Sequence, residues 1–238
     1  MKNIIFIDWD DTLFPTTWIN NNSIDCKNKE DINKYKLFFL ELDKSISNLL
    51  EILTDNNDNA VYIVTNANKK WVELCLSSLP NTSSIIDKDV TILSAKDIYN
   101  QKTNSMMDWK ILTFKDIVND MYINNVNINN ALEIDGLYAS IHPSQPSSFI
   151  GNVISIGDSN YEYTALLNLY DYLKNNGFKL YNTSKKKEKE YLLKNIKLVD
   201  KPEFDIIINQ LYVLKKNING IIEQKNVIDI LLEPMMMQ

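Results

Sequence analysis

Histidine and cysteine are scarce in this sequence, and their scarcity disfavours several kinds of site. The two cysteines, Cys26 and Cys75, are far apart, and neither belongs to a Cys-x-x-Cys pair. This spacing argues against a disulfide framework and against a zinc site. His142 is the only histidine, and no motif accompanies it that would indicate a serine–histidine–aspartate triad.

A long apolar run and an excess of positive charge are also absent. The apolar residues near the N-terminus extend only from Ile4 to Ile7, and no run approaches the ~18 residues that span a bilayer. We therefore expect no signal peptide and no membrane partner. The unpaired cysteines favour a cytoplasmic location, with the nucleus as the alternative. The net charge of −6 disfavours nucleic acid as a partner, although a local basic patch would be an exception.

Hydrophobic residues make up 45% of the chain. They occur either in short continuous runs or at helical spacing, and segments of the two kinds alternate along the chain. Short runs rich in β-branched residues predict strands at 3–7, 60–64, 90–93, 153–156 and 196–199. Apolar residues at helical spacing predict helices at 31–53, 69–79, 109–121, 160–175 and 202–216. Strands that alternate with helices indicate an α/β protein, with a doubly wound parallel sheet and helices on both faces.

The length of the chain is that of one domain. We predict a single core over residues 1–216, with a small helical flap around 14–58 and a loop insertion around 125–152. The intervals between the predicted strands leave no room for a large cap domain. Residues 217–238 are expected to form a C-terminal helix or tail.

An acidic motif, Asp8-Trp9-Asp10-Asp11-Thr12, directly follows the first predicted strand. Side chains two positions apart in an extended chain point the same way, so Asp8 and Asp10 can face one pocket. Two carboxylates this close repel each other unless a cation neutralises them or one is protonated. Because carboxylate oxygens favour a hard cation, we predict a Mg²⁺ site here.

Polar residues also end the second and fourth predicted strands. Thr65 ends the second strand, Asp158 follows the fourth, and Glu162 lies near the first turn of the next predicted helix. In a parallel α/β sheet, ligands bind at the carboxyl ends of the strands. The hydroxyl of Thr65, with backbone N–H groups at the start of the following helix, suits a phosphate oxygen.

At these positions the sequence resembles the haloacid dehalogenase superfamily of aspartate-nucleophile phosphatases, from Asn3 to about Gln210. The motifs of that family match, in chain order, Asp8, Asp10 and Thr12, then Thr65, then Lys110, then Asp158 and Glu162. The N-terminal strand followed by Asp-x-Asp-x-Thr is the most specific of these matches. The lysine is the least specific, because Lys96, Lys102 and Lys115 lie nearby.

The resemblance implies a magnesium-dependent phosphohydrolase that acts on a phosphorylated substrate. It implies that Asp8 attacks phosphorus to form an aspartyl-phosphate, and that Asp10 first gives and then takes the proton. Mg²⁺ would be bound by the Asp8 carboxylate, the Asp10 backbone carbonyl and Asp158. The remaining implied roles are phosphate binding for Thr65, Asn66 and Lys110, and support of the site for Thr12 and Glu162.

Other functions remain open at this point. A receiver domain also uses acidic residues, a threonine and a lysine, but its phosphorylated aspartate follows the third strand and its chain is typically shorter. A catalytically silent binding or regulatory protein could retain the same fold. Without a large cap the site would be open, which favours a macromolecular phosphoester, with a small phosphorylated metabolite as the alternative.

Overall fold

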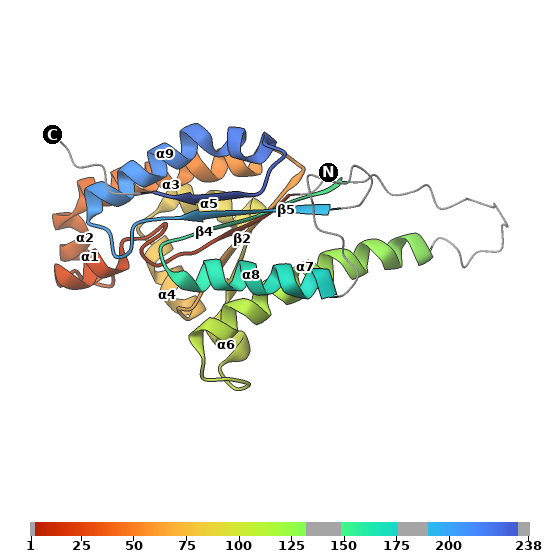
Figure 1. Cartoon of the computed structure of the whole chain (residues 1–238). Helices are drawn as coiled ribbons and strands as arrows, with labels where there is room; N and C mark the ends of the chain where they lie inside the picture. Colours follow the sequence, from red (N-terminus) through yellow and green to blue (C-terminus); the bar gives the residue numbers. More distant parts are fainter. Residues whose placement is uncertain (1–2, 132–148, 176–189, 233–238) are drawn as a thin grey trace.

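The computed structural model describes residues 3–131, 149–175 and 190–232, and its centre is a six-stranded sheet (Figure 1). All the strands are parallel, and their order is β3-β2-β1-β4-β5-β6. In chain order they are β1 (Asn3–Ile7), β2 (Asn59–Thr65), β3 (Val90–Ser94), β4 (Phe149–Gly157), β5 (Glu190–Lys197) and β6 (Ile228–Leu231). The prediction of an α/β protein with a parallel sheet is therefore confirmed.

Both faces of the sheet are buried. Side chains alternate between the two faces along each strand, so one strand can contribute to both core clusters. In β1, Ile5 and Ile7 belong to one core cluster, whereas Ile4 and Phe6 belong to the other. All four are at most 1% exposed. Burial on both faces explains why the sequence of β1 is a continuous apolar run and does not alternate with polar residues.

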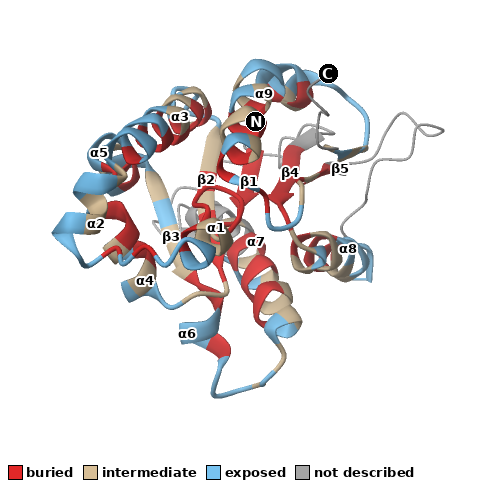
Figure 2. Cartoon of the chain, turned by 90° about the vertical axis from the view of Figure 1, so that its left-hand side faces the viewer, coloured by how far each residue is buried: buried red, intermediate tan, exposed pale blue. Residues whose placement is uncertain are grey.

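Helices cover both faces of the sheet, and the strands form a buried layer between them (Figure 2). One face packs against α3 (Lys36–Thr54), α4 (Lys69–Leu76), α5 (Pro80–Asp89) and α9 (Phe204–Glu223). The other face packs against α6 (Ala95–Tyr99), α7 (Met106–Ala131) and α8 (Asn160–Asn175). Two short helices, α1 (Thr16–Asn21) and α2 (Lys29–Lys34), lie between β1 and α3 in the chain. None of the described helices combines the length and the apolar content needed to cross a bilayer.

Several helix boundaries differ from those expected. The helix predicted at 31–53 is divided at Tyr35 into α2 and α3. The helix predicted at 69–79 ends at Leu76, and Pro80 begins a separate helix, α5. Proline fits the first turn of a helix because the N–H that it lacks has no partner there. Pro80 therefore marks the beginning of a second helix, which the spacing of apolar residues alone did not predict.

Two further differences concern segments predicted to be irregular. Helix α7 and strand β4 both extend into the loop insertion predicted at 125–152; residues 132–148, which include His142, lie outside the described residues. The C-terminal helix or tail predicted at 217–238 contains the end of α9 and the sixth strand, β6, which pairs with β5. Only Ile228 and Ile230 of β6 pack against the core, so its apolar pattern is too short to have predicted a strand.

The carboxyl ends of β1 and β4 lie side by side at the centre of the sheet. Ile7 is paired with Ile156, and the backbone N–H of Asp8 donates to the carbonyl of Ile156 over 2.9 Å. Strands β2 and β3 lie on one side of β1, whereas β4, β5 and β6 lie on the other. The strand order therefore reverses between β1 and β4, which is where sheets of this kind form a ligand-binding crevice.

Candidate active site

Three buried carboxylates meet at the carboxyl ends of β1 and β4. Asp8 follows β1, Asp158 follows β4, and Glu162 lies in the first turn of α8. One carboxylate oxygen from each lies within 4.8 Å of the others, and the three residues are at most 7% exposed. The structure therefore brings together Asp8 and Asp158, as the sequence predicted, and it places Glu162 beside them.

Lys110, from α7, supplies the positive charge of this cluster. Its Nζ lies 2.8 Å from Oδ1 of Asp8, and it also forms a buried ion pair with Glu162. The sequence left three neighbouring lysines as alternatives. Of these, Lys102 and Lys115 lie over the rings of tyrosines outside the site. Among the described residues, Lys110 is thus the lysine whose side chain forms ion pairs with the acidic cluster.

Burial controls the protonation of these groups. Burial raises the pKa of Asp8 well above its ordinary value, and the carboxylates of Glu162 and Asp158 add to this rise, while Lys110 opposes it. Burial and the nearby carboxylates of Glu162 and Asp11 raise the pKa of Asp158 to about 7. Burial alone would lower the pKa of Lys110, but Asp8 and Glu162 outweigh it and raise the pKa above the ordinary value. Burial therefore favours the protonated forms of Asp8 and Asp158 unless a cation neutralises their charge.

Glu162 occupies its position only because Gly157 has no side chain. A Cβ at position 157 would lie 2.3 Å from Cγ of Glu162 and 2.6 Å from its Oε2. From this position Oε2 accepts hydrogen bonds from the backbone N–H of Ser159 (3.2 Å) and from its hydroxyl (2.6 Å), while Oε1 contacts Lys110. The glycine of the Gly-Asp motif is therefore required here by close approach of a side chain.

Thr12 and Lys197 hold Asp158 in place. The hydroxyl of Thr12 accepts a hydrogen bond from the Asp158 backbone N–H (3.0 Å) and lies 3.3 Å from its Oδ1, to which it can donate. Lys197, at the end of β5, donates to the Asp158 carbonyl oxygen. Thr12, for which a supporting role was predicted, thus contacts Asp158 directly. Lys197 was missed, because a single lysine at a strand end carries no signal in the sequence.

The carboxylate of Asp10 is bound by three hydrogen-bond donors and does not belong to the group of three buried carboxylates. Its Oδ1 accepts from the Thr16 hydroxyl (2.5 Å) and from Nε1 of Trp71 (2.9 Å), and its Oδ2 accepts from the Thr65 hydroxyl (3.1 Å). Thr65 in turn accepts from the backbone N–H of Ala67 over 2.9 Å. The two residues predicted to act as acid–base and as phosphate ligand are therefore direct neighbours, and neither Thr16 nor Trp71 was predicted.

Two further polar residues of the motifs are engaged with the backbone. The amide nitrogen of Asn66, a predicted phosphate ligand, donates to the Met106 carbonyl over 3.1 Å. Its Oδ1 is buried and has no hydrogen-bond partner within the part of the chain that the structure describes. Asp11 has a positive φ of 55°, and its carboxylate accepts from the backbone N–H of Thr17 over 2.7 Å. Asp11 thus holds the first turn of α1 and is not part of the acidic cluster.

One pocket of about 830 Å³ joins these groups to the surface. Asp8, Asp10, Lys110 and Asp158 line it. Its other walls carry large side chains and two lysines: Trp71, Met106, Met107, Tyr161, Lys197 and Lys201. The acidic cluster is therefore open to a ligand that can approach from one side.

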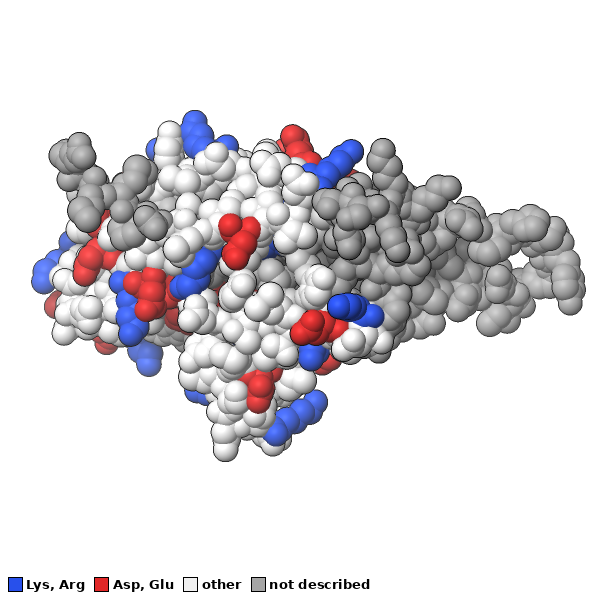
Figure 3. Space-filling model, viewed as in Figure 1, with Lys and Arg blue, Asp and Glu red and all other residues white. Residues whose placement is uncertain are grey.

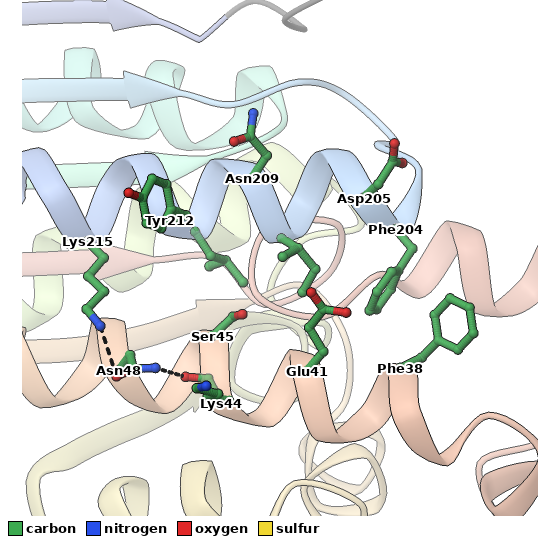
Figure 4. A pocket seen from close by; sticks show the side chains of 12 residues that line it. Phe38, Glu41, Lys44, Ser45, Asn48, Phe204, Asp205, Asn209, Tyr212 and Lys215 are labelled. Carbon is green, nitrogen blue, oxygen red and sulfur yellow. Dashed lines mark hydrogen bonds between the residues drawn. The ribbon is translucent and has the colours of Figure 1, made fainter. Parts of the chain in front are cut away.

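A second hollow, of about 740 Å³, lies between α3 and α9 (Figure 4). Aromatic side chains such as Phe38, Phe204 and Tyr212 line it, and Lys215 donates to Asn48 over 2.9 Å along its side. Among the described residues, the group of acidic side chains that could hold a metal ion lies at the strand ends and not here. The pocket at the carboxyl ends of β1 and β4 is therefore the candidate site.

Comparison of the chain with protein-family models, with curated proteins and with solved structures found no match.

Proposed function

We propose that this protein is a magnesium-dependent phosphohydrolase that uses the carboxylate of Asp8 as its nucleophile. The observation that carries the proposal is the meeting of Asp8, Asp158 and Glu162 with the buried Lys110 where the strand order reverses. In the haloacid dehalogenase resemblance these are the nucleophile, metal-binding and phosphate-binding positions. Motifs up to 154 residues apart in the chain thus supply one site, as the resemblance requires.

The acidic cluster fits Mg²⁺ in its chemistry and in its dimensions. Opposite ligands of one Mg²⁺ ion lie about 4 Å apart, which is close to the 4.8 Å that encloses the three carboxylate oxygens. Both oxygens of Glu162 already bind Lys110 and Ser159, whereas Asp8 and Asp158 line the pocket. We infer that Asp8 and Asp158 are the direct ligands and that Glu162 acts behind them. When bound, the ion would neutralise negative charge on the carboxylates and on the phosphoryl oxygens.

The side chains divide the reaction into two displacements. An oxygen of Asp8 forms a bond to phosphorus as the bond to the leaving oxygen breaks, and Asp10 gives that oxygen a proton. Water then attacks phosphorus, the bond to Asp8 breaks, and Asp10 takes a proton from the water. Lys110 lies 2.8 Å from Asp8, so its charge opposes the rise in the pKa of Asp8 and can stabilise the transferred phosphoryl group.

Dinucleotide binding is the main alternative use of this strand order, and the residues after β1 argue against it. A dinucleotide-binding sheet needs a glycine-rich turn after its first strand, so that the backbone can approach the pyrophosphate. Residues 8–13 are Asp-Trp-Asp-Asp-Thr-Leu and contain no glycine. Carboxylates at this place would repel a pyrophosphate unless a cation intervened, which again favours a metal-dependent site.

The substrate is proposed to be a phosphoester that reaches an open site. Among the described residues, α3 and α5, from the two intervals around β2, pack on the sheet, so they do not form a separate cap. On the face seen in Figure 3, acidic and basic side chains are interspersed, without a basic patch that would attract nucleic acid. We favour a phosphoprotein or another macromolecular ester, and a small phosphorylated metabolite is the alternative.

The proposal is tested by hydrolysis of p-nitrophenyl phosphate with and without Mg²⁺, and by trapping the phosphorylated aspartate with borohydride followed by mass spectrometry. We expect Asp8→Asn to lower kcat at least ~10³-fold and to abolish the trapped adduct. The matched control is Asp171→Asn, because Asp171 is an exposed residue of α8. Turnover that survives in Asp8→Asn, or a wild-type protein that neither hydrolyses phosphoesters nor binds beryllium fluoride at Asp8, would contradict the proposal.

A further inference from the structure

Trp71 makes a contact with the site that the motifs do not account for. Its indole N–H donates to Oδ1 of Asp10 over 2.9 Å, and the Thr16 hydroxyl donates to the same oxygen over 2.5 Å. Among the described residues, the other oxygen, Oδ2, accepts a hydrogen bond only from the Thr65 hydroxyl, at 3.1 Å. The two oxygens of Asp10 are therefore in different surroundings.

The indole ring is held from two directions. The backbone N–H of Trp71 donates to the side chain of Asn68, the N-cap of α4, over 2.9 Å. Its ring packs edge-on against Phe14, with ring centres 6.0 Å apart and planes at 88°. Phe14 is completely buried, so the ring of Trp71, which belongs to α4, is held against the chain that follows β1. Its N–H consequently points at Asp10 from a rigid position.

An indole N–H can only donate, and it cannot rotate away as a hydroxyl can. With two donors directed at Oδ1, that oxygen has little capacity left to exchange a proton with a ligand. Oδ2 differs, because the Thr65 hydroxyl that contacts it can both donate and accept. The Thr65 hydroxyl can accept from a protonated Oδ2, whereas a proton on Oδ1 would face the hydrogen of the indole, which cannot accept.

We propose that Trp71 is a positioning residue for Asp10: by holding Oδ1, it makes Oδ2 the oxygen that carries protons during catalysis. This inference rests on the proposed function. In the first displacement the Oδ2 proton passes to the leaving oxygen as the bond from phosphorus to that oxygen breaks. In the second, a proton of the attacking water passes to Oδ2 as the bond from phosphorus to Asp8 breaks. The two transfers restore Asp10 to its starting state.

The effect of losing the indole N–H on kcat/KM depends on how much the leaving group needs a proton. An alkoxide is a poor leaving group and depends on general acid catalysis, which contributes about 10²–10⁴-fold, whereas p-nitrophenolate leaves readily without a proton. Loss of the indole N–H should therefore reduce kcat/KM for an alkyl phosphate much more than for p-nitrophenyl phosphate. Both substrates pass through the same aspartyl-phosphate, so the comparison isolates the first displacement.

The experiment compares kcat/KM for glycerol 2-phosphate and p-nitrophenyl phosphate in the wild type and in Trp71→Phe, which keeps an aromatic ring against Phe14. We expect the ratio of the two values to shift at least tenfold against the alkyl ester. Trp109→Phe is the matched control, because Nε1 of Trp109 donates to the Thr103 carbonyl over 2.7 Å, away from Asp10. Its ratio should equal that of the wild type.

Equal losses on both substrates, or no loss on either, would overturn the inference and leave Trp71 a structural residue. If Trp71→Phe does not fold, Thr16→Val removes the other donor to Oδ1, and the same shift in ratio is expected. The failure of the proposed function is distinguishable, because the wild type would then form no trapped aspartyl-phosphate. A wild type that forms the adduct, with an unshifted ratio in both variants, would refute only the role of Trp71.

Discussion

Replacing Gly157 with alanine should disturb the proposed Mg²⁺ site directly, because the space for a Cβ is filled by Glu162. The added carbon would lie 2.3 Å from Cγ of Glu162, whereas carbon atoms in contact are about 3.5 Å apart or more. Glu162 must therefore move by roughly 1 Å. The backbone of residue 157 cannot move instead. Gly157 is the last residue of β4, and its carbonyl accepts a hydrogen bond from the backbone N–H of Leu198 over 2.8 Å.

The size of the effect follows from the bonds that Glu162 makes. A shift of this size disrupts its contacts with Lys110 and with the N–H and hydroxyl of Ser159. Hydrogen bonds to a charged group contribute about 1.5–3 kcal/mol each, and water can replace part of what is lost. We expect Gly157→Ala to lower the free energy of unfolding by about 2–4 kcal/mol and to weaken Mg²⁺ binding.

The measurements are urea-induced unfolding in chelator and calorimetric titration with Mg²⁺. Gly220→Ala is the matched control, because it lies within α9 and a Cβ there would meet nothing within 4 Å. Alanine stabilises a helix relative to glycine, so we expect this control to be more stable by about 0.5–1 kcal/mol and to bind Mg²⁺ normally. If Gly157→Ala were as stable as the wild type and bound Mg²⁺ as tightly, Glu162 would not occupy the space beside Gly157.

Two buried lysines give further predictions. Lys110→Met should cost about 3–5 kcal/mol of unfolding free energy in chelator, because it leaves the carboxylates of Asp8 and Glu162 unpaired. Added Mg²⁺ should reduce this deficit in thermal unfolding, and a deficit that is the same with and without the ion would contradict the charge argument. Lys194 donates to three carbonyls at the end of α9, and although burial lowers its pKa to about 8, it stays charged at neutral pH. Lys194→Met should therefore cost about 2–4 kcal/mol in urea unfolding at pH 7, without altering Mg²⁺ binding, and a neutral effect would show that water satisfies those carbonyls.

The sequence by itself determined the class of the fold and the chain positions of the acidic residues. In the run Asn3–Ile7 every residue except Asn3 is apolar. A strand that is buried on both faces requires such a continuous apolar run. Asp8 follows it directly, and Asp158 follows the similar run before Gly157. Because the carboxyl ends of parallel strands share one edge, local pattern and topology together predicted that these two residues converge.

The tertiary structure decided which contacts the other side chains make, including Lys110 and Glu162, which the motif resemblance had already indicated. Lys110 and Glu162 are 52 residues apart, and their pairing depends on how α7 packs beside α8, which no local periodicity encodes. The contact of Trp71 with Asp10 likewise depends on the position of α4 relative to the chain after β1. Strand β6 was hidden because only two of its residues face the core. Hydrophobic spacing records which face of an element is buried, whereas the partner of a buried polar group is set by the packing of elements distant in the chain.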